Sequence, residues 1–438
     1  MNFVRFLCIC IISLHCFAIA LAADQPNIII IVGDDLGYGE LSSMGNRQIQ
    51  TPNIDHIAAQ GLSFNQAYLT APVCAPSRAG LMTGRYQARF GYENLTGGME
   101  IQKSDDRGVP PSEKLLPQYL QELGYATGAV GKWHLGFNPK YRPNVRGFDD
   151  FFGFLLGGHS YMEWNQPYET TVGGPILRNT EPVEGEGYLT ERFTQEAVNY
   201  IESHSGKPFF LWVAYFNVHL PLDVPEKYMH GLPDSLDPDR RTMLGMIRAL
   251  DTGVGDIVNA IDDNGIADNT LLIFLSDNGG LRREWVDNGK LSGGKVTLWE
   301  GGIRTPLYMR WPEKFSAGST YKEPVSTLDF MPTILNIAGA TEVPGHLDGV
   351  DLMPYIDDDR QGAPHDNLYW RFGNKGQWNA VRAGQYKYMK DNRGDEYLFD
   401  LVNDVAEQKN LKDQMPDRFT DLRNRYQQWN GPMPAVRF

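Results

Sequence analysis

Long uninterrupted hydrophobic runs are the strongest pattern along this chain. Residues 27–32, 209–216 and 270–275 consist almost entirely of Ile, Val, Leu, Phe and other apolar residues. Such a run predicts a strand buried on both faces, as in a parallel sheet that helices cover on both sides. The other predicted elements of this α/β arrangement are helices at 115–123 and 240–264 and shorter strands at 126–130 and 307–310.

The pattern changes from about residue 366. Short hydrophobic runs recur at the spacing of β-hairpins, and a polar helix is expected at 415–429. We therefore expect a signal over 1–22, a large α/β domain over 23–360 and a small antiparallel α+β subdomain over 361–438. The strand candidates of the subdomain are 368–370, 380–382, 386–388 and 397–399.

The first 22 residues have the pattern of a secretion signal. Arg5 supplies the positive start, residues 6–21 are mostly apolar, and a small-residue cleavage site ends at Ala22. A membrane anchor is the competing interpretation, but the apolar segment is short and His15 interrupts it. A lipid on Cys16 is a further alternative, although His15 fits that signal poorly. We expect cleavage and export to the periplasm or the medium, with no stable membrane insertion.

Composition narrows the possible partners. The chain has 438 residues, a formal net charge of −14 and no long run of Lys or Arg, which argues against a nucleic-acid partner. An acidic protein that handles an anionic substrate must gather its cations locally. Any such site should therefore be a basic pocket on an acidic body.

The cysteines single out one position. Three of the four lie in the predicted signal, so the mature chain keeps Cys74 alone and can form no internal disulfide. Cys74 stands just before a predicted helix that has Pro76 in its first turn and ends at Gly84. Arg78 lies one turn along the same side, so the helix N-terminus forms an anion site beside the thiol. The alternative is a buried structural cysteine.

Polar clusters directly follow four of the hydrophobic runs. Taken alone, an Asp-Asp pair is more often a turn or a helix cap, and a Lys and a His in a loop are often solvated. In an open parallel sheet, however, ligands bind outside the carboxyl ends of the strands, so we expect all four clusters to converge on one site. They are Asp34 with Asp35, Lys132 with His134, His219, and Asp277 with Asn278.

Several motifs resemble those of the formylglycine-dependent sulfatases. The stretch 74–85, Cys-Ala-Pro-Ser-Arg-Ala-Gly-Leu-Met-Thr-Gly-Arg, resembles the maturation and active-site motif of that family, and Gly-Lys-Trp-His-Leu-Gly at 131–136 matches a second motif. Residues 51–55 resemble the N-terminal pattern, and 398–401 with 407–411 resemble the end of the C-terminal subdomain. The resemblance covers nearly the whole mature chain.

This resemblance implies a fold, a modified residue and a metal. The fold is the alkaline-phosphatase-like one, a mixed sheet sandwiched by helices. A maturation enzyme oxidises Cys74 to formylglycine, whose hydrate is the nucleophile, and Ca²⁺ is the usual metal. Hard oxygen ligands suit that ion. The implied metal ligands are Asp34, Asp35, Asp277, Asn278 and an oxygen of the modified Cys74.

The resemblance also implies roles for the basic side chains. Arg78 would hold the hydrate, and Lys132 and Lys295 would bind sulfate oxygens. His134 would be the base that releases sulfate, and His219 would lie near the leaving oxygen. Whether His219 or Lys295 protonates the leaving group stays open at this point.

Residues 138–190 are rich in Gly, Pro, Asn, Tyr and Trp and predict long loops, which often decide substrate choice. Arg142, Arg146 and His159 are candidates for binding a sulfated sugar, with a surface or packing role equally expected. Algal polysaccharides such as carrageenan, or glycosaminoglycans, are the expected substrates.

Two other functions compete with a sulfatase. A phosphatase or phosphonate monoester hydrolase of the same fold would use the same metal site, but it usually has Ser or Thr in place of Cys74. A binding protein with a degenerate site would lack a ligand or a cation, whereas every expected position is filled.

Overall fold

The computed structural model describes residues 25–94, 107–166, 173–373 and 376–436. The predicted signal peptide, 1–22, lies outside these residues. Within them, no helix combines the length and the apolar character needed to cross a membrane.

A ten-stranded mixed sheet forms the centre of the molecule, in the order β12-β2-β11-β9-β1-β8-β4-β5-β6-β7. The neighbouring strands β9 (Thr270–Ser276), β1 (Asn27–Gly33), β8 (Phe209–Ala214) and β4 (Ala126–Lys132) are all parallel. The long hydrophobic runs therefore form the middle of the sheet, as predicted. The other strands are β2 (Leu62–Phe64), β5 (Asp150–Phe154), β6 (Leu177–Arg178), β7 (Glu181–Pro182), β11 (Leu307–Arg310) and β12 (Ser319–Tyr321).

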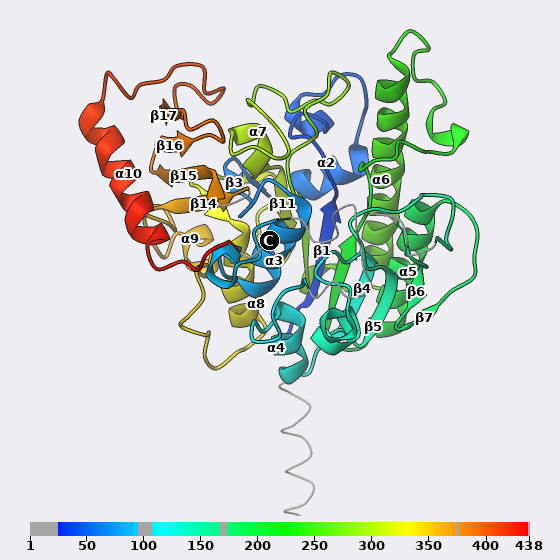
Figure 1. Ribbon diagram of the computed structural model, residues 1–438. Coiled ribbons are helices and arrows are strands. Elements are labelled where there is room, and N and C mark those ends of the chain that lie inside the picture. Colours follow the sequence, from blue (N-terminus) through cyan, green and yellow to red (C-terminus); the bar gives the residue numbers. More distant parts are fainter. Residues whose placement is uncertain (1–24, 95–106, 167–172, 374–375, 437–438) are drawn as a thin grey trace, which may run out of the picture.

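Helices cover both faces of this sheet (Figure 1). Alternate residues of β1 point to opposite faces, so Ile28 and Ile30 belong to one hydrophobic cluster and Ile29 and Ile31 to the other. The first cluster includes residues of α3 (Cys74–Thr83), α4 (Leu116–Glu122) and α8 (Phe330–Ile337). The second includes residues of α2 (Pro52–Ala59), α5 (Leu189–His204) and α6 (Pro238–Asp263). The prediction of a sheet sandwiched by helices is confirmed.

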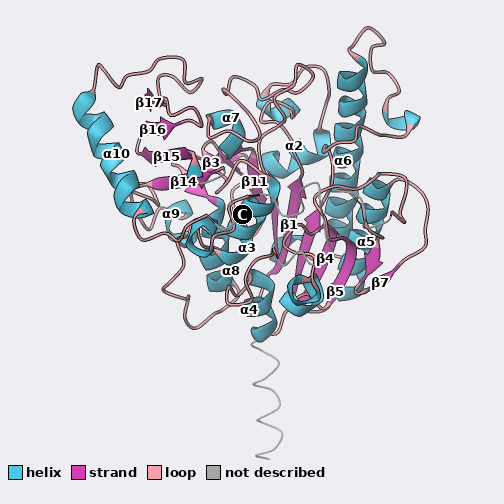
Figure 2. Ribbon diagram, in the orientation of Figure 1, coloured by secondary structure: helices cyan, strands magenta, loops and turns pink. Residues whose placement is uncertain are grey.

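The C-terminal region forms its own antiparallel sheet in chain order, with α10 (Pro416–Asn430) against it (Figure 2). The side chains on one face of this sheet pack against α10, and those on the other face pack against Tyr68, Val73, Leu298 and Ile303. The predicted subdomain is thus present and packs against β3 (Ala67–Tyr68), α7 (Glu300–Ile303) and the residues before α3 and α7, while its boundary at 360/361 stays a prediction. Its strands are β14 (Leu368–Phe372), β15 (Trp378–Ala383), β16 (Tyr386–Lys390) and β17 (Glu396–Asp400).

The prediction of loops over 138–190 is only partly right. β5, which contains Phe151, Phe152 and Phe154, pairs in parallel with β4 and extends the main sheet, and β6 and β7 follow it as antiparallel edge strands. Gly153 interrupts this aromatic run. The run is also short, so its periodicity does not distinguish it from the glycine-rich loops around it.

Candidate active site

Cys74 is the first residue of α3 and lies over the carboxyl edge of the central strands. The helix begins one residue earlier than the sequence predicts, with Val73 as N-cap, and ends at Thr83, followed by Gly84 as C-cap in a left-handed conformation (φ 63°). The side chain of Cys74 is buried, and burial raises the pKa of the thiol. Because the thiolate is the reactive form of cysteine, the unmodified residue would be a weak nucleophile here.

The carboxylates that follow β1 and β9 lie next to Cys74. One ligand atom each from Asp34, Cys74 and Asp277 lie within 4.8 Å of one another, and the same holds for Asp34, Asp35 and His219. Among the described residues, buried Asp34 Oδ1 and Asn278 Oδ1 have no hydrogen-bond partner. Buried oxygens without donors fit a hard cation such as Ca²⁺.

Backbone hydrogen bonds between the strand ends hold these carboxylates together. The Asp34 amide donates to Asn217 O (2.7 Å), and the Asp277 amide donates to Gly33 O (3.0 Å). Asp35 then adopts a left-handed conformation (φ 62°), which an Asp residue tolerates better than most. The chain therefore turns sharply at the end of β1, and two adjacent carboxylates reach one site.

Three cations face the carboxylates. Lys132 Nζ lies 2.5 Å from Asp34 Oδ2, Lys295 Nζ lies 2.5 Å from Asp35 Oδ1, and Arg78 Nη2 lies 2.8 Å from Asp277 Oδ2. Burial alone would raise the pKa of Asp35, but Lys295 and its neighbours outweigh burial and hold that pKa below its usual value. Burial raises the pKa of Asp277 to about 6.

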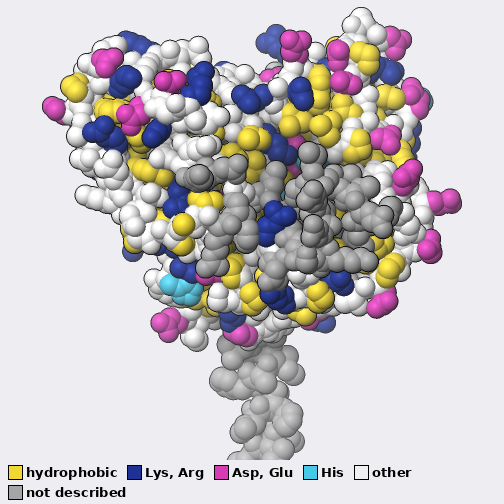
Figure 3. Space-filling model, viewed as in Figure 1, with side chains coloured by type: hydrophobic (Ala, Val, Ile, Leu, Met, Phe, Trp, Pro, Cys, Tyr) yellow, Lys and Arg dark blue, Asp and Glu magenta, His cyan; other side chains and the backbone are white. Residues whose placement is uncertain are grey.

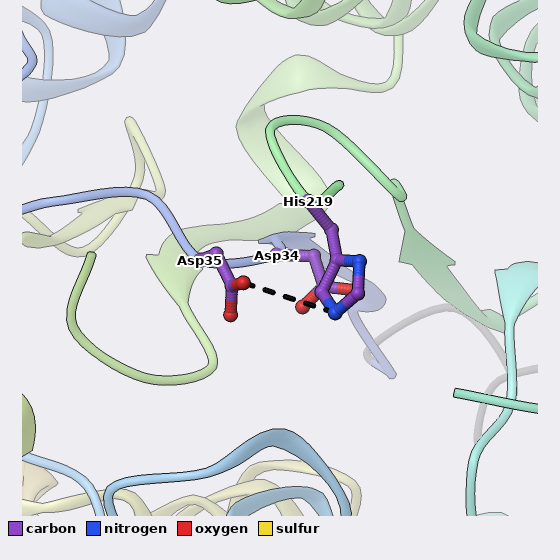
Figure 4. A group of neighbouring side chains, drawn as sticks. All are labelled: Asp34, Asp35 and His219. Carbon is purple, nitrogen blue, oxygen red and sulfur yellow. Dashed lines mark ion pairs between the residues drawn. The ribbon is translucent and has the colours of Figure 1, made fainter. Parts of the chain in front are cut away.

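Two histidines were also expected at this site, and His219 lies beside the carboxylates. His219 Nε2 lies 3.8 Å from Asp35 Oδ2 (Figure 4), and burial together with the nearby Lys132 lowers the pKa of this histidine to about 3. The His219 backbone carbonyl accepts a hydrogen bond from the hydroxyl of Tyr161 (2.9 Å). His134 is buried, and Gly157 lies against its ring, where a Cβ atom would come within 2.7 Å of the imidazole.

Each of the four clusters therefore contributes at least one side chain to a common site, as predicted, and the place of His134 in that site stays a prediction. Their individual roles in catalysis and metal binding stay predictions. Figure 3 shows Lys and Arg side chains scattered over the face drawn, both toward its middle and near its edges, with many Asp and Glu side chains nearer the edges.

The three substrate-binding candidates have other contacts. Buried Arg146 donates to the backbone carbonyls of Val109 (2.6 Å) and Glu113, and Arg142 donates to the carbonyl of Phe137 (3.4 Å). The two ring nitrogens of buried His159 lie 2.7 Å from Ser160 O and 2.9 Å from Gly174 O. These contacts hold the three side chains within the fold, and their roles in substrate binding stay predictions.

The contacts that position the Lys295 loop were not predicted from the sequence. The Lys295 amide donates to Gly280 O (2.9 Å), next to the Asp277 turn, and the Ser292 hydroxyl donates to Ala406 O (2.6 Å) in the C-terminal region. Lys387 of β16 pairs with Glu300, which follows this loop in the chain, and with Glu407. All three side chains are fully buried. The sequence offers one sign of such a network, namely charged residues within segments that resemble the family motifs.

Buried carboxylates, three cations and a helix N-terminus at the carboxyl edge of a parallel sheet define a centre for hydrolysis of anionic esters. The sulfatase family matches residues 26–340, and the family of the N-sulphoglucosamine sulphohydrolase C-terminal region matches residues 294–429. The chain belongs to the sulfatase family and is a sulfuric ester hydrolase.

Individual relatives agree with this assignment. The chain is 34% identical to N-acetylgalactosamine-6-sulfatase of Mus musculus, over 84% of this chain and 72% of the relative. It is 30% identical to arylsulfatase J of Mus musculus, over 94% of this chain and 77% of the relative. Among solved structures, the chain is similar to the crystal structure of Ps i-CgsB in complex with k-i-k-neocarrahexaose. The two sequences are 36% identical, and the match covers 94% of each chain with a TM-score of 0.88.

Proposed function

We propose that this sulfatase removes sulfate from a sulfated carbohydrate through a formylglycine made from Cys74 and with the help of Ca²⁺. The observation that carries the proposal is the position of Cys74, buried at the N-terminus of α3 and within 4.8 Å of carboxylate oxygens of Asp34 and Asp277. A phosphatase or phosphonate monoester hydrolase remains the alternative, and the cysteine at this position argues against it.

The metal would be held by Asp34, Asp35, Asp277 and Asn278, with an oxygen of the modified residue 74. The unpartnered buried oxygens of Asp34 and Asn278 support this ligand set. When bound, Ca²⁺ supplies Lewis-acid polarisation of sulfate oxygens.

The chain's own cations then have separate tasks. Lys132 and Lys295 lie on the two adjacent carboxylates and would neutralise the charge of an entering sulfate group. Arg78 is fixed by Asp277 and by the carbonyl of Lys132 (2.6 Å), so it would hold residue 74 and the substrate in place. Preorganised donors of this kind stabilise charge that develops in the transition state.

Proton transfers are assigned to the remaining groups. His134, whose ring Gly157 confines, is the proposed proton acceptor at residue 74. His219 or Lys295 donates the proton to the departing sugar oxygen. Each such transfer contributes about 10²–10⁴-fold in rate.

The substrate class is supported by relatives. One of them is named for N-acetylgalactosamine 6-sulfate, and Ps i-CgsB was crystallised with neocarrahexaose. We therefore propose a sulfated galactan of the carrageenan type, with a galactosamine-containing glycosaminoglycan second. We further propose that residues 1–22 direct export and that a maturation enzyme converts Cys74.

Sulfate release from carrageenan oligosaccharides, followed by ion chromatography, tests the function. Protein produced together with the maturation enzyme should release sulfate, and a Cys74→Ala variant should release none above background. Faster hydrolysis of a phosphate monoester than of any sulfate ester would instead favour the phosphatase.

A further inference from the structure

A cavity of about 370 Å³ with both polar and apolar walls opens beside the Lys295 loop, between that loop and the C-terminal sheet. Arg282, Val296 and Trp299 line it from the main domain. Trp378 of β15 and Arg393, in the turn between β16 and β17, line it from the other side. None of the roles assigned above uses these side chains.

The cavity lies beside the loop that carries Lys295, and Val296 is the lining residue next to that lysine in the chain. Consecutive Cα atoms are about 3.8 Å apart, and Val296 directly follows Lys295. The Val296 amide donates to Pro72 O (3.0 Å), two residues before Cys74. Val296 has a left-handed backbone (φ 72°) and its side chain is exposed, whereas the side chain of Lys295 is buried among the carboxylates. The turn therefore presents one residue to the sulfate site and the next to the cavity.

The guanidinium group of Arg282 has no charged partner among the described residues. Its exposed side chain lies over Gly294, where a Cβ atom would come within 3.0 Å of Arg282 Cγ. The described residues give it neither a hydrogen bond nor an ion pair. Arg393, by contrast, lies 3.2 Å from Oδ2 of Asp391, which also lines the cavity, and 3.6 Å from Asp395 Oδ2, so carboxylates balance its charge. The cavity is therefore left with one unbalanced guanidinium group, which suits an anion.

The two tryptophans give the cavity apolar walls. Trp299 packs against Tyr397 and Phe399, with ring centroids 5.3 and 5.4 Å away, so the C-terminal sheet holds its indole ring in place. Trp378 is largely buried. An indole ring has an apolar face and a polar N–H group. It can therefore pack against a sugar ring, which also has apolar and polar parts.

We propose that this cavity is a second saccharide subsite, which binds a sulfated sugar unit adjoining the one that loses its sulfate. The proposal rests on the function proposed above and makes the C-terminal sheet part of the substrate-binding surface. Arg282 binds the sulfate of the second unit, and Trp299 and Trp378 contact its ring. The enzyme should accordingly favour oligosaccharides over short or non-sugar sulfate esters.

The test compares kcat/KM for a carrageenan hexasaccharide with kcat/KM for 4-methylumbelliferyl sulfate, which has no second sugar. Loss of a hydrogen bond to a charged group should lower the ratio of the two values about 10-fold in Arg282→Ala, mainly through KM. Arg282→Lys, which keeps the charge, should lie between Arg282→Ala and the wild type. The neighbouring Arg283 is also exposed and does not line the cavity, so Arg283→Ala is the matched control and should keep the wild-type ratio.

The outcomes separate the two proposals. If the wild type cleaves the aryl ester but releases no sulfate from the hexasaccharide, both the substrate class and the subsite are wrong. If the wild type desulfates the hexasaccharide and Arg282→Ala keeps a ratio within about 2-fold of the wild type, the subsite alone is wrong. A fall in Arg283→Ala equal to that in Arg282→Ala would also overturn the subsite, because the effect would then not depend on the cavity.

Discussion

Replacing Lys387 by methionine removes the ammonium group that bridges two buried carboxylates. Lys387 Nζ lies 2.9 Å from Glu300 Oε1 and 2.9 Å from Glu407 Oε1, and all three side chains are fully buried. Methionine fills a similar volume without charge, so the perturbation is chiefly electrostatic. The network joins β16 to α7 (Glu300–Ile303), which follows the Lys295 loop.

Removing one partner of a buried ion pair costs about 3–5 kcal/mol, because the other charge is left uncompensated. Glu300 keeps a hydrogen bond from the hydroxyl of Tyr68 (2.6 Å), so the loss falls mainly on Glu407. Burial raises the pKa of Glu407 to about 7, which lets this carboxyl take up a proton near neutral pH. We therefore expect a cost near the lower limit, about 3 kcal/mol at pH 7.

Urea unfolding at pH 7 measures this cost. Lys390 lies at the end of the same strand and is only half-buried, so Lys390→Met is the matched control and should change the free energy of unfolding by about 0.5 kcal/mol or less. Adding Glu407→Gln to Lys387→Met should recover about 1 kcal/mol, because it removes the uncompensated charge. Equal stability of Lys387→Met and Lys390→Met would refute the reasoning.

Three further predictions concern the metal, Arg78 and His365. Chelation with EDTA should lower sulfate release about 100-fold or more, and added Ca²⁺ should restore it; unchanged release would contradict the metal site. Arg78→Lys loses the bonds to Asp277 and to the Lys132 carbonyl and should lower kcat about 10–100-fold, whereas wild-type kcat would remove Arg78 from the mechanism. Burial lowers the pKa of His365, but its contact with Asp329 (2.7 Å) outweighs burial and raises that pKa above 6.5. Protonated His365 therefore stabilises the fold below about pH 6.5 and loses this effect as pH rises through the raised pKa. His365→Gln should then lower the melting temperature more at pH 5.5 than at pH 8.5, and the reverse order would contradict this assignment.

The centre of the fold could be predicted because its signals are local. Hydrophobic runs buried on both faces define β1, β8 and β9, and the polar residues after each run must meet once the strands are parallel neighbours. β5 was missed because a short aromatic run with Gly153 inside it has no clear period.

Side-chain roles were harder to predict because they depend on contacts made across the fold. Arg146, for example, donates to carbonyls of Val109 and Glu113, residues that no local pattern pairs with it, while its role in substrate binding stays a prediction. The hydrogen bonds of Glu300 join residues 87 and 107 positions apart along the chain, and no local pattern predicts such partners.

The state of residue 74 is the most direct test of the proposed chemistry. The measurement is the mass of the tryptic peptide ending at Arg78, from protein made in cells that contain the maturation enzyme, before and after treatment with an aldehyde-trapping reagent. The account predicts a formylglycine at position 74 that the reagent modifies. An unmodified thiol, in protein that nevertheless hydrolyses sulfate esters, would contradict the proposed nucleophile.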